Sequence, residues 1–442
     1  MSAGPPEGQL LRRGEPGYEA ARQSAVWNPR KPKRYPDCIV LATSADDVVW
    51  AVRAAAAEGL RVSVRSGGHS WYGNCVRDAG MLIDLSRLTE VVIDHGTMTA
   101  AVGPAVTGRQ LDAELIEQDL FFPIGHCGTV GIGGFALGGG YGWNSRVRGP
   151  ACLSIRAIDV VLASGELLTA DDSNHPELLW SARGAGPGFF GVVTRFYLEL
   201  CARPRMLRAT DVYPLDVHDE VIQWALELLP SLPPEVEMSA RVGYSHLVGE
   251  PAVTLTGLAF ASSDADPVGL LEPLARCPVL GRALKRTRTA IERLPDLHDR
   301  GTDGPVIRWD VDGIWTDLPA SEILPAAAAA GLRSIPSEHS FVLWMLWGHH
   351  PVRENACWSI QAPLYLSPNA GWEDVSDDAR HERWVDEALR SLAPYSRGVQ
   401  FSDANLAARA GEGVSAENAR RIEEIRALYD PDGLFFSYLL AA

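Results

Sequence analysis

The stretch Ser66-Gly67-Gly68-His69-Ser70 follows Leu60-Arg61-Val62-Ser63-Val64-Arg65, whose alternating β-branched residues predict a strand. Two glycines after a strand permit a sharp turn, and they bring backbone N–H groups close to an anion such as a pyrophosphate. The same turn would hold the imidazole of His69 beside whatever the loop binds. The stretch therefore predicts an anion-binding turn with a histidine at its edge.

A second loop, Gly125-His126-Cys127-Gly128-Thr129-Val130-Gly131, carries a thiol with an imidazole directly before it and glycines around the pair. Such surroundings could expose and activate a thiolate. Taken alone, a histidine after two glycines is most often a loop residue, and a lone cysteine is usually a small buried hydrophobe. The two loops in one chain are a more specific signal than either one.

A nicotinamide site is the main alternative, because Gly131-Ile132-Gly133-Gly134-Phe135-Ala136 formally fits G-x-G-x-x-A. That pattern needs a strand directly before it and a helix directly after it. Here Phe121-Phe122-Pro123-Ile124-Gly125-His126-Cys127 precedes it, with Pro and Gly where strand residues belong. Further glycines at 138, 139, 140 and 142 fit poorly with a continuous helix. The sequence disfavours a nicotinamide site.

Together the two loops resemble those of the berberine-bridge-enzyme-like flavoproteins, within the vanillyl-alcohol-oxidase type FAD-binding fold. In oxidases of that family the histidine is bonded to the flavin 8α-methyl group and the cysteine to ring carbon C6. By position, the resemblance implies that FAD is bonded to His69 and Cys127. It runs through most of residues 18–203 and resumes weakly at 395–442. A plain glycine turn and a buried thiol are the structural alternatives.

The resemblance also bears on the rest of the flavin site. Val130 matches the position of the family's oxygen gate, where a bulkier Leu is associated with poor oxygen access, so Val130 favours an oxidase over a dehydrogenase. Glycines at 133, 134, 138, 139, 140 and 142 would let the backbone lie against a flat ring. The expected cofactor-binding residues are Ser66, Gly67, Gly68, His69, Ser70, Cys127, Thr129, Val130, Gly133, Gly134, Gly139, Gly142, Val193 and Tyr438.

The C-terminal part departs from the family. The family's Tyr-x-Asn stretch aligns best with Gly398-Val399-Gln400, so the usual tyrosine is Gly398 and the asparagine is Gln400. A later family asparagine is replaced by Tyr438. Since hydroxyl oxidation needs a proton acceptor, we expect Tyr365 to take that role and Gln400 to orient a substrate oxygen. Other tyrosines and a set of tryptophans are candidates for the base or for an aromatic cleft: Tyr72, Tyr141, Tyr395, Trp71, Trp344, Trp347 and Trp358.

Composition narrows the class of protein. The chain has 442 residues, 46% of them hydrophobic and 22% charged, which suits a soluble protein of two or more domains. A net charge of −16 argues against nucleic acid or an anionic membrane as partner. The sequence shows neither an apolar run long enough to span a membrane nor a secretory signal. Seven scattered cysteines without metal-ligand spacing predict a cytoplasmic protein without a metal site.

The hydrophobic pattern predicts an α+β fold with a two-part FAD-binding domain and an inserted antiparallel-sheet substrate domain. We expect the FAD-binding domain over 1–203, the substrate domain over 204–397 and the return to the FAD-binding domain over 398–442, with residues 1–15 disordered. Alternation over 252–260 predicts a strand of the inserted sheet, whereas 43–58, 107–117, 217–229, 377–392 and 416–428 have helical patterns.

These features predict an FAD-dependent oxidase that oxidises an alcohol or hemiacetal carbon of a bulky natural product or glycoside, with molecular oxygen as acceptor. Two other functions stay open. One is flavin-dependent ring closure or C–C bond formation, and the other is a flavin-loaded binding protein whose catalysis is lost at Gly398.

Overall fold

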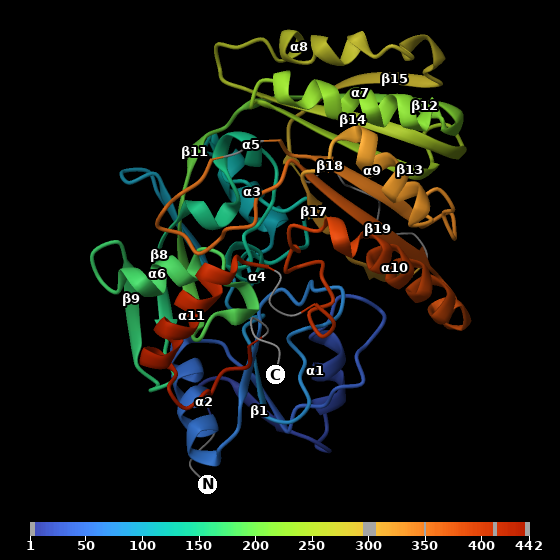
Figure 1. Ribbon diagram of the computed structural model, residues 1–442. Coiled ribbons are helices and arrows are strands. Elements are labelled where there is room, and N and C mark those ends of the chain that lie inside the picture. The colour runs from blue at the N-terminus through green and yellow to red at the C-terminus, as the bar shows by residue number, and fades with distance from the viewer. Residues whose placement is uncertain (1–4, 295–305, 349–350, 410–412, 438–442) are drawn as a thin grey trace.

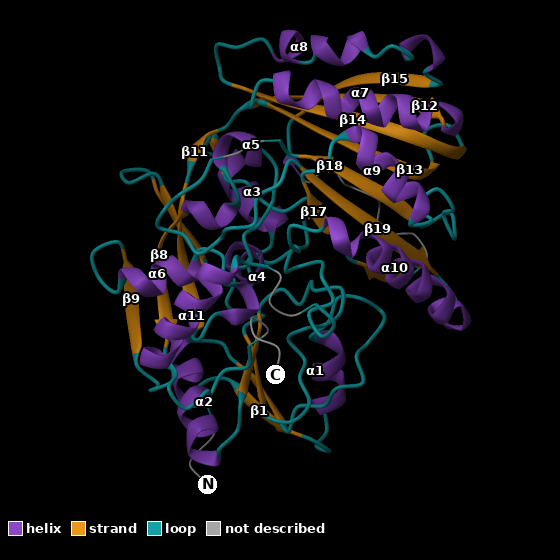
Figure 2. Ribbon diagram, in the orientation of Figure 1, coloured by secondary structure: helices purple, strands orange, loops and turns teal. Residues whose placement is uncertain are grey.

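The computed structural model describes residues 5–294, 306–348, 351–409 and 413–437. In that part of the chain the strands form a four-stranded, a five-stranded and an eight-stranded sheet, together with a two-stranded ribbon. Helices and strands are mixed throughout (Figures 1 and 2). The expected α+β class with an antiparallel inserted sheet is confirmed.

The four-stranded sheet has the order β1-β2-β4-β3, in which β2, β4 and β3 run parallel. Its strands are β1 (Gln9–Arg12), β2 (Cys38–Leu41), β4 (Met81–Asp84) and β3 (Val62–Arg65). The prediction of disorder over 1–15 was wrong for Gln9–Arg12, because β1 pairs antiparallel with β2 and buries Leu11 against α1 (Tyr18–Ser24), whereas residues 1–4 lie outside the described residues. Between β2 and β3 lies α2 (Ala45–Glu58), which begins at a capping box of Ser44 and Asp47 and ends at Gly59.

The five-stranded sheet is antiparallel and has the order β5-β6-β10-β8-β9. Its strands are β5 (Val91–Asp94), β6 (Thr99–Val102), β10 (Val192–Glu199), β8 (Ile155–Val161) and β9 (Leu167–Asp171), and β7 (Leu120–Phe121) pairs with β11 (Cys201–Ala202). The accompanying helices are α3 (Gly108–Ile116), α4 (Ile132–Leu137), α5 (Ser145–Arg148) and α6 (Pro176–Ala182). One hydrophobic core joins this sheet to the four-stranded one.

The eight-stranded sheet forms the upper right of Figure 1. Its order is β15 (Lys285–Ile291), β12 (Arg205–Pro214), β14 (Glu250–Ala261), β13 (Val236–Ser245), β18 (Phe341–Leu346), β19 (Leu364–Trp372) and β16 (Arg308–Val311), with β17 (Ile314–Thr316) also paired to β19. The helices of this half are α7 (His218–Leu228), α8 (Pro267–Leu270), α9 (Ala320–Ala329) and α10 (Asp378–Leu392).

Successive side chains of β19 face opposite sides of the sheet. Leu364 and Leu366 belong to the core shared with α7, α9 and α10. Tyr365, Ser367 and Asn369 face the other side, where they line a cavity. Because of this alternation, one face of β19 packs in the core and the other, free face lines the cavity.

The C-terminal segment packs against the four- and five-stranded sheets, which together form the first half of the molecule. Helix α11 (Ala416–Tyr429) lies beside α6 (Figure 1), and the Arg426 guanidinium donates to the Gly188 carbonyl. Beyond α11, the Val62 amide donates to the Leu434 carbonyl at 2.7 Å, and the Phe436 amide to that of Val62 at 2.9 Å. Residues 434–436 thus lie next to β3, directly before the Ser66–Ser70 loop.

Candidate active site

A cavity of about 400 Å³ lies between the first half of the molecule and the free face of the eight-stranded sheet. At one end its walls come from β3, Arg77, Phe435 and Phe436, and at the other from Val311, Leu343 and β19. The Ser66–Ser70 loop, the Cys127 loop and the segment 400–403 line the stretch between them. An elongated ligand in this cavity would therefore contact both halves of the molecule.

The two loops singled out in the sequence meet in space. Their backbones touch, because a Cβ placed on Gly67 would lie 2.6 Å from the Gly131 amide nitrogen and only glycine fits there. The Ser66 Oγ accepts a hydrogen bond from the Gly134 amide at 3.1 Å. His69 Nε2 lies 3.0 Å from Thr129 Oγ1. The two loops that the sequence singled out therefore form one continuous wall of the cavity.

The Ser66–Ser70 loop presents unused hydrogen-bond donors. Gly68 has φ +68°, and the carbonyl oxygen of Ala25 would lie 2.4 Å from any Cβ there, so the turn requires glycine. The backbone N–H groups of Gly67, Gly68, His69 and Ser70 donate no hydrogen bond to another described residue. Arg65, at the start of the turn, also lines the cavity. These donors can bind an anionic group such as a pyrophosphate.

His69 is held by aromatic rings. The indole of Trp27 stacks on its imidazole with centroids 4.5 Å apart, and that of Trp71 meets it edge-on at 6.2 Å. Desolvation lowers the pKa of His69 to about 4, so the ring is neutral near pH 7. A neutral imidazole has one ring nitrogen with a free lone pair, which a nucleophile needs.

Cys127 differs from the other cysteines of the chain. All seven cysteines lie in described residues and are free thiols, and Cys127 alone among them is exposed. Its sulfur lies in the cavity wall and accepts from the Thr129 hydroxyl at 4.0 Å. Burial raises the pKa of Cys38 and of Cys75 to about 11, which keeps those two thiols protonated. Exposure therefore distinguishes Cys127 as the reactive candidate.

The other predicted cofactor residues divide into three groups. Val130, Gly133, Gly134 and Val193 line the cavity. Gly139 and Gly142 do not, because their missing side chains face Trp358 and the Ile124 carbonyl, so these glycines serve packing. Tyr438 lies outside the described residues.

Tyr365 and Gln400 both line the cavity. Tyr365 Oη donates to Asp403 Oδ2 at 3.0 Å, and Trp71 Nε1 donates to Asp403 Oδ1 at 3.0 Å. The Gln400 amide donates to Ser402 Oγ at 3.0 Å. The tyrosine and the carboxylate form a hydrogen-bonded pair on the cavity wall, and sequence analysis had missed Asp403.

The electrostatics of this pair follow from burial and from neighbouring charge. Desolvation and the adjacent carboxylates of Asp403 and Asp312 raise the pKa of Tyr365 well above its usual value. Desolvation also raises the pKa of Asp403, against the hydrogen bonds from Trp71 and Tyr365. Burial raises the pKa of Asp312 to about 6, although Arg409 Nη1 contacts its carboxylate at 2.9 Å. Tyr365 therefore stays protonated and Asp403 is the basic partner.

The other aromatic candidates lie elsewhere. Trp71 lines the cavity, whereas the prediction for Trp344, Trp347 and Trp358 was wrong, because all three are buried in the cores. Tyr141 lines the cavity, but its hydroxyl donates to the Ile360 carbonyl at 3.3 Å. Tyr72 is hydrogen-bonded to Asp310, and Tyr395 is exposed.

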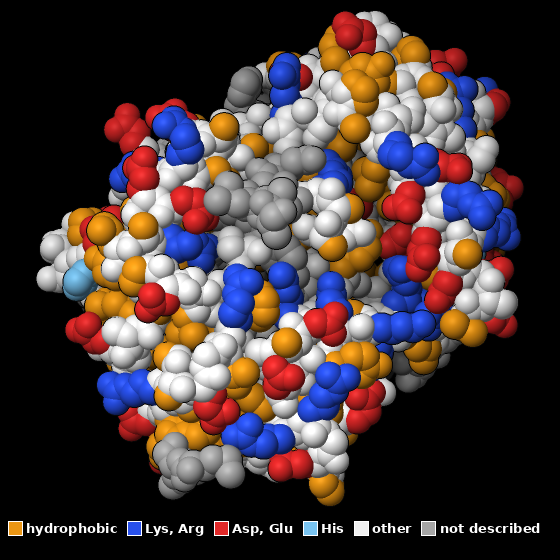
Figure 3. Space-filling view, turned by 60° about the horizontal axis from the view of Figure 1, so that its bottom comes forward, with side chains coloured by type: hydrophobic (Ala, Val, Ile, Leu, Met, Phe, Trp, Pro, Cys, Tyr) orange, Lys and Arg blue, Asp and Glu red, His pale blue; other side chains and the backbone are white. Residues whose placement is uncertain are grey.

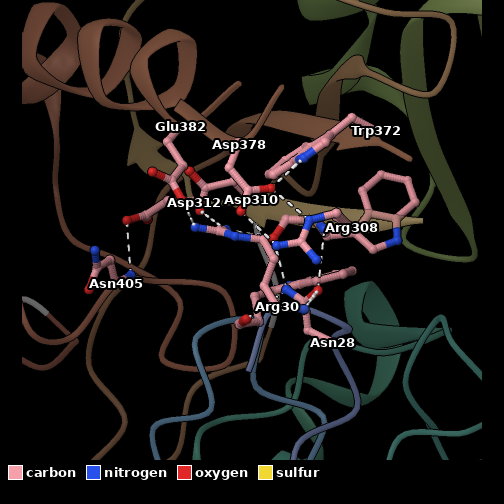
Figure 4. Close-up of polar contacts among 11 residues, drawn as sticks. Asn28, Arg30, Arg308, Asp310, Asp312, Trp372, Asp378, Glu382 and Asn405 are labelled. Atoms are coloured by element: carbon pink, nitrogen blue, oxygen red, sulfur yellow. Dashed lines mark hydrogen bonds and ion pairs between the residues drawn. The ribbon is translucent and has the colours of Figure 1, made fainter. Parts of the chain in front are cut away.

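A polar network fixes the sheet against the first half of the molecule (Figure 4). Arg30 reaches across to β16, where it donates to the Trp309 carbonyl at 2.8 Å and to Asp310 Oδ1 at 2.9 Å, and it also pairs with Glu382 of α10. Next to it, Arg308 makes two hydrogen bonds of 2.6 Å to the Asp378 carboxylate. The network holds Val311, which follows Asp310, in the cavity wall.

Comparison with known proteins shows which family the chain belongs to. Residues 36–171 match the FAD binding domain family, and this range contains both loops. Over 431 residues the chain is 31% identical to an FAD-linked oxidoreductase, penO, of Penicillium crustosum, covering 95% of this chain and 94% of the relative. The chain belongs to the FAD-linked oxidoreductases. It is a flavin oxidoreductase, and FAD is its cofactor.

Solved structures agree on the fold. The Physcomitrella patens BBE-like 1 protein superposes with a TM-score of 0.84 at 18% identity, covering 99% of this chain and 98% of that one. The 6-hydroxy-D-nicotine oxidase of Arthrobacter nicotinovorans gives a TM-score of 0.83 at 24% identity, covering 97% and 96%. The flavoprotein has this fold over nearly its whole length.

In the described ranges the helices are too short or too polar to cross a bilayer, and His, Cys, Asp and Glu side chains do not gather into a metal site. On the face shown in Figure 3, basic and acidic side chains are interspersed.

Proposed function

We propose that the protein is an oxidase whose FAD is bonded to both His69 and Cys127 and whose substrate is a bulky natural product or glycoside. The N–H groups of the Ser66–Ser70 loop would bind the pyrophosphate, and Gly133, Gly134 and Val193 would contact the rest of the cofactor. FAD, when bound, accepts a hydride from the carbon that is oxidised and returns two electrons to dioxygen. Both His69 and Cys127 line the cavity and both contact Thr129, which supports the two bonds.

The observation that carries the catalytic proposal is the Tyr365–Asp403 pair on the free face of the sheet. An alcohol or hemiacetal carbon must lose a hydroxyl proton as it loses its hydride. Tyr365 Oη can accept that proton only while it passes its own proton to Asp403 Oδ2. We therefore assign Tyr365 as the relay and Asp403 as the final acceptor, which refines the expectation that Tyr365 acts alone.

Gln400 would orient the substrate oxygen, because its amide is neutral and can donate or accept a hydrogen bond without taking a proton. Val130 in the cavity wall would leave dioxygen a path to the ring. The apolar lining from Val311 and Leu343 suits a large and uncharged substrate body.

A substrate panel tests the proposal in two steps. Under anaerobic conditions a true substrate should bleach the flavin absorbance, and admission of air should restore the absorbance with release of hydrogen peroxide. Tyr365→Phe should slow the bleaching by roughly 10²-fold, as expected for a lost proton-transfer group. Bleaching without peroxide in air would indicate a dehydrogenase, and an unchanged rate in Tyr365→Phe would remove this tyrosine from the mechanism.

A further inference from the structure

Thr129 lies between the two side chains to which the flavin is proposed to be attached. Its Oγ1 is 3.0 Å from His69 Nε2, and it donates to Cys127 Sγ at 4.0 Å. Thr129 itself does not line the cavity. Its hydroxyl therefore contacts both attachment residues from the side away from the ligand space.

The orientation of the His69 ring is fixed by its neighbours. Trp27 stacks on the ring with an interplanar angle of 19°, and Trp71 meets its edge at 77°. With Nε2 directed to Thr129, Nδ1 is the ring nitrogen that no other described side chain contacts. Nδ1 is thus the nitrogen available to a ligand in the cavity.

The hydroxyl of Thr129 has a single hydrogen and two lone pairs. When that hydrogen is directed to the Cys127 sulfur, which lies 4.0 Å away, the oxygen can serve His69 only as an acceptor. Nε2 then carries the ring proton, and Nδ1 keeps its lone pair. The low pKa of His69, which follows from desolvation, keeps the ring neutral at pH 7.

We propose that Thr129 is the positioning residue for both covalent attachments: it selects the Nε2–H tautomer of His69, so that Nδ1 attacks, and it aligns the Cys127 sulfur with the same hydroxyl. This inference rests on the proposed bicovalent attachment and deepens it. The side chain acts through His69 and Cys127 and forms no bond to the cofactor itself.

Each attachment can be written as a balanced oxidation by dioxygen. His69 Nδ1 forms a bond to the methyl carbon, which loses one hydrogen, while Nε2 releases its proton through Thr129. The two electrons set free reduce dioxygen, and the two hydrogens leave as hydrogen peroxide. For Cys127 a carbon–sulfur bond replaces a ring C–H bond and the S–H bond, again with one peroxide formed per dioxygen.

The test compares Thr129→Val, which has the same shape without the hydroxyl, with Thr129→Ser, which keeps the hydroxyl. Thr289→Val, at an exposed position of β15, controls for a general effect of the substitution. Full-length proteins are purified after a short pulse of expression and incubated with FAD in air. The flavin absorbance of the native protein measures binding, acid-resistant flavin measures attachment, and peptide mapping assigns the bonds to His69 and Cys127.

Thr129→Val should bind flavin in the native state but attach it roughly 10²-fold more slowly, the range for a lost proton-transfer group. Thr129→Ser and Thr289→Val should attach it at the wild-type rate. Both bonds formed at the wild-type rate in Thr129→Val would overturn the inference and leave the bicovalent attachment standing. A wild-type chain that releases all its flavin in acid would overturn the attachment and this inference together. If Thr129→Val does not bind flavin, Thr129→Ala replaces it and is judged by the same outcomes.

Discussion

Asp403→Asn tests the proton relay without changing the size of the side chain. Asp403 accepts hydrogen bonds of 3.0 Å from Tyr365 Oη and Trp71 Nε1, one on each carboxylate oxygen, and a longer one of 3.4 Å from Ser402 Oγ. An asparagine has one acceptor oxygen and one donor nitrogen. One of the two partners therefore loses its acceptor, and the negative charge that attracts the proton of Tyr365 is removed.

The size of the effect follows from the lost interaction. A hydrogen bond to a charged group contributes about 1.5–3 kcal/mol. Since about 1.4 kcal/mol corresponds to a factor of ten in rate, flavin reduction should slow by roughly 10- to 100-fold. Tyr365→Phe should have an effect of similar size. The double variant should be no slower than the slower single variant, because both residues serve the same proton transfer.

The assay is anaerobic stopped-flow reduction of the flavin at saturating substrate, followed across pH. Asp403 must be ionised to accept the proton, and burial raises its pKa. The wild-type rate should therefore fall as pH decreases through this raised pKa, and Asp403→Asn should lose that dependence. Asp317→Asn, at an exposed aspartate after β17, is the matched control and should behave as the wild type. A wild-type rate in Asp403→Asn, or additive losses in the double variant, would refute the relay.

Three further predictions concern the loops and the network. Gly67→Ala places a Cβ 2.6 Å from the Gly131 amide, so it should lower the free energy of unfolding by about 1–3 kcal/mol and lower the flavin content. Gly281→Ala, where nothing lies within 4 Å of the new Cβ, should do neither, and equal flavin content in the two variants would contradict the tight loop contact. Arg30→Met leaves the buried Asp310 without its cation and should lower the free energy of unfolding, measured by urea titration, by about 3–5 kcal/mol. A change below about 1 kcal/mol would show that the network of Figure 4 contributes little to stability. Val130→Leu should slow reoxidation of the flavin by dioxygen while anaerobic reduction keeps its rate, and unchanged reoxidation would remove Val130 from the oxygen path.

Local signals in the sequence predicted much of this structure. Ser44, Asp47 and Gly59 mark the ends of α2, and the β-branched run before Ser66 marks β3. The glycines of the two loops predicted the flavin site, because the loop backbones lie so close together that no side chain fits between them. Such signals are contained within a few residues, so they can be interpreted without knowing the tertiary structure.

What escaped prediction depends on contacts between distant segments. Gln9–Arg12 is a strand only because Cys38–Leu41 lies beside it. Asp403 becomes the partner of Tyr365 only when segment 400–403 passes the free face of β19. Of the tryptophans expected in the cleft, Trp344, Trp347 and Trp358 instead fill the cores, since an aromatic side chain alone does not indicate which side of an element it occupies.

Peptide mapping of the acid-denatured protein tests the central claim most directly. If the two loops together hold the cofactor, protease digestion should yield one flavin-bearing product that contains both the His69 peptide and the Cys127 peptide. His69→Ala and Cys127→Ala should each leave a single attachment, and the double variant should release all its flavin in acid. Flavin that leaves the wild-type protein completely in acid, or that stays attached in the double variant, would contradict the account.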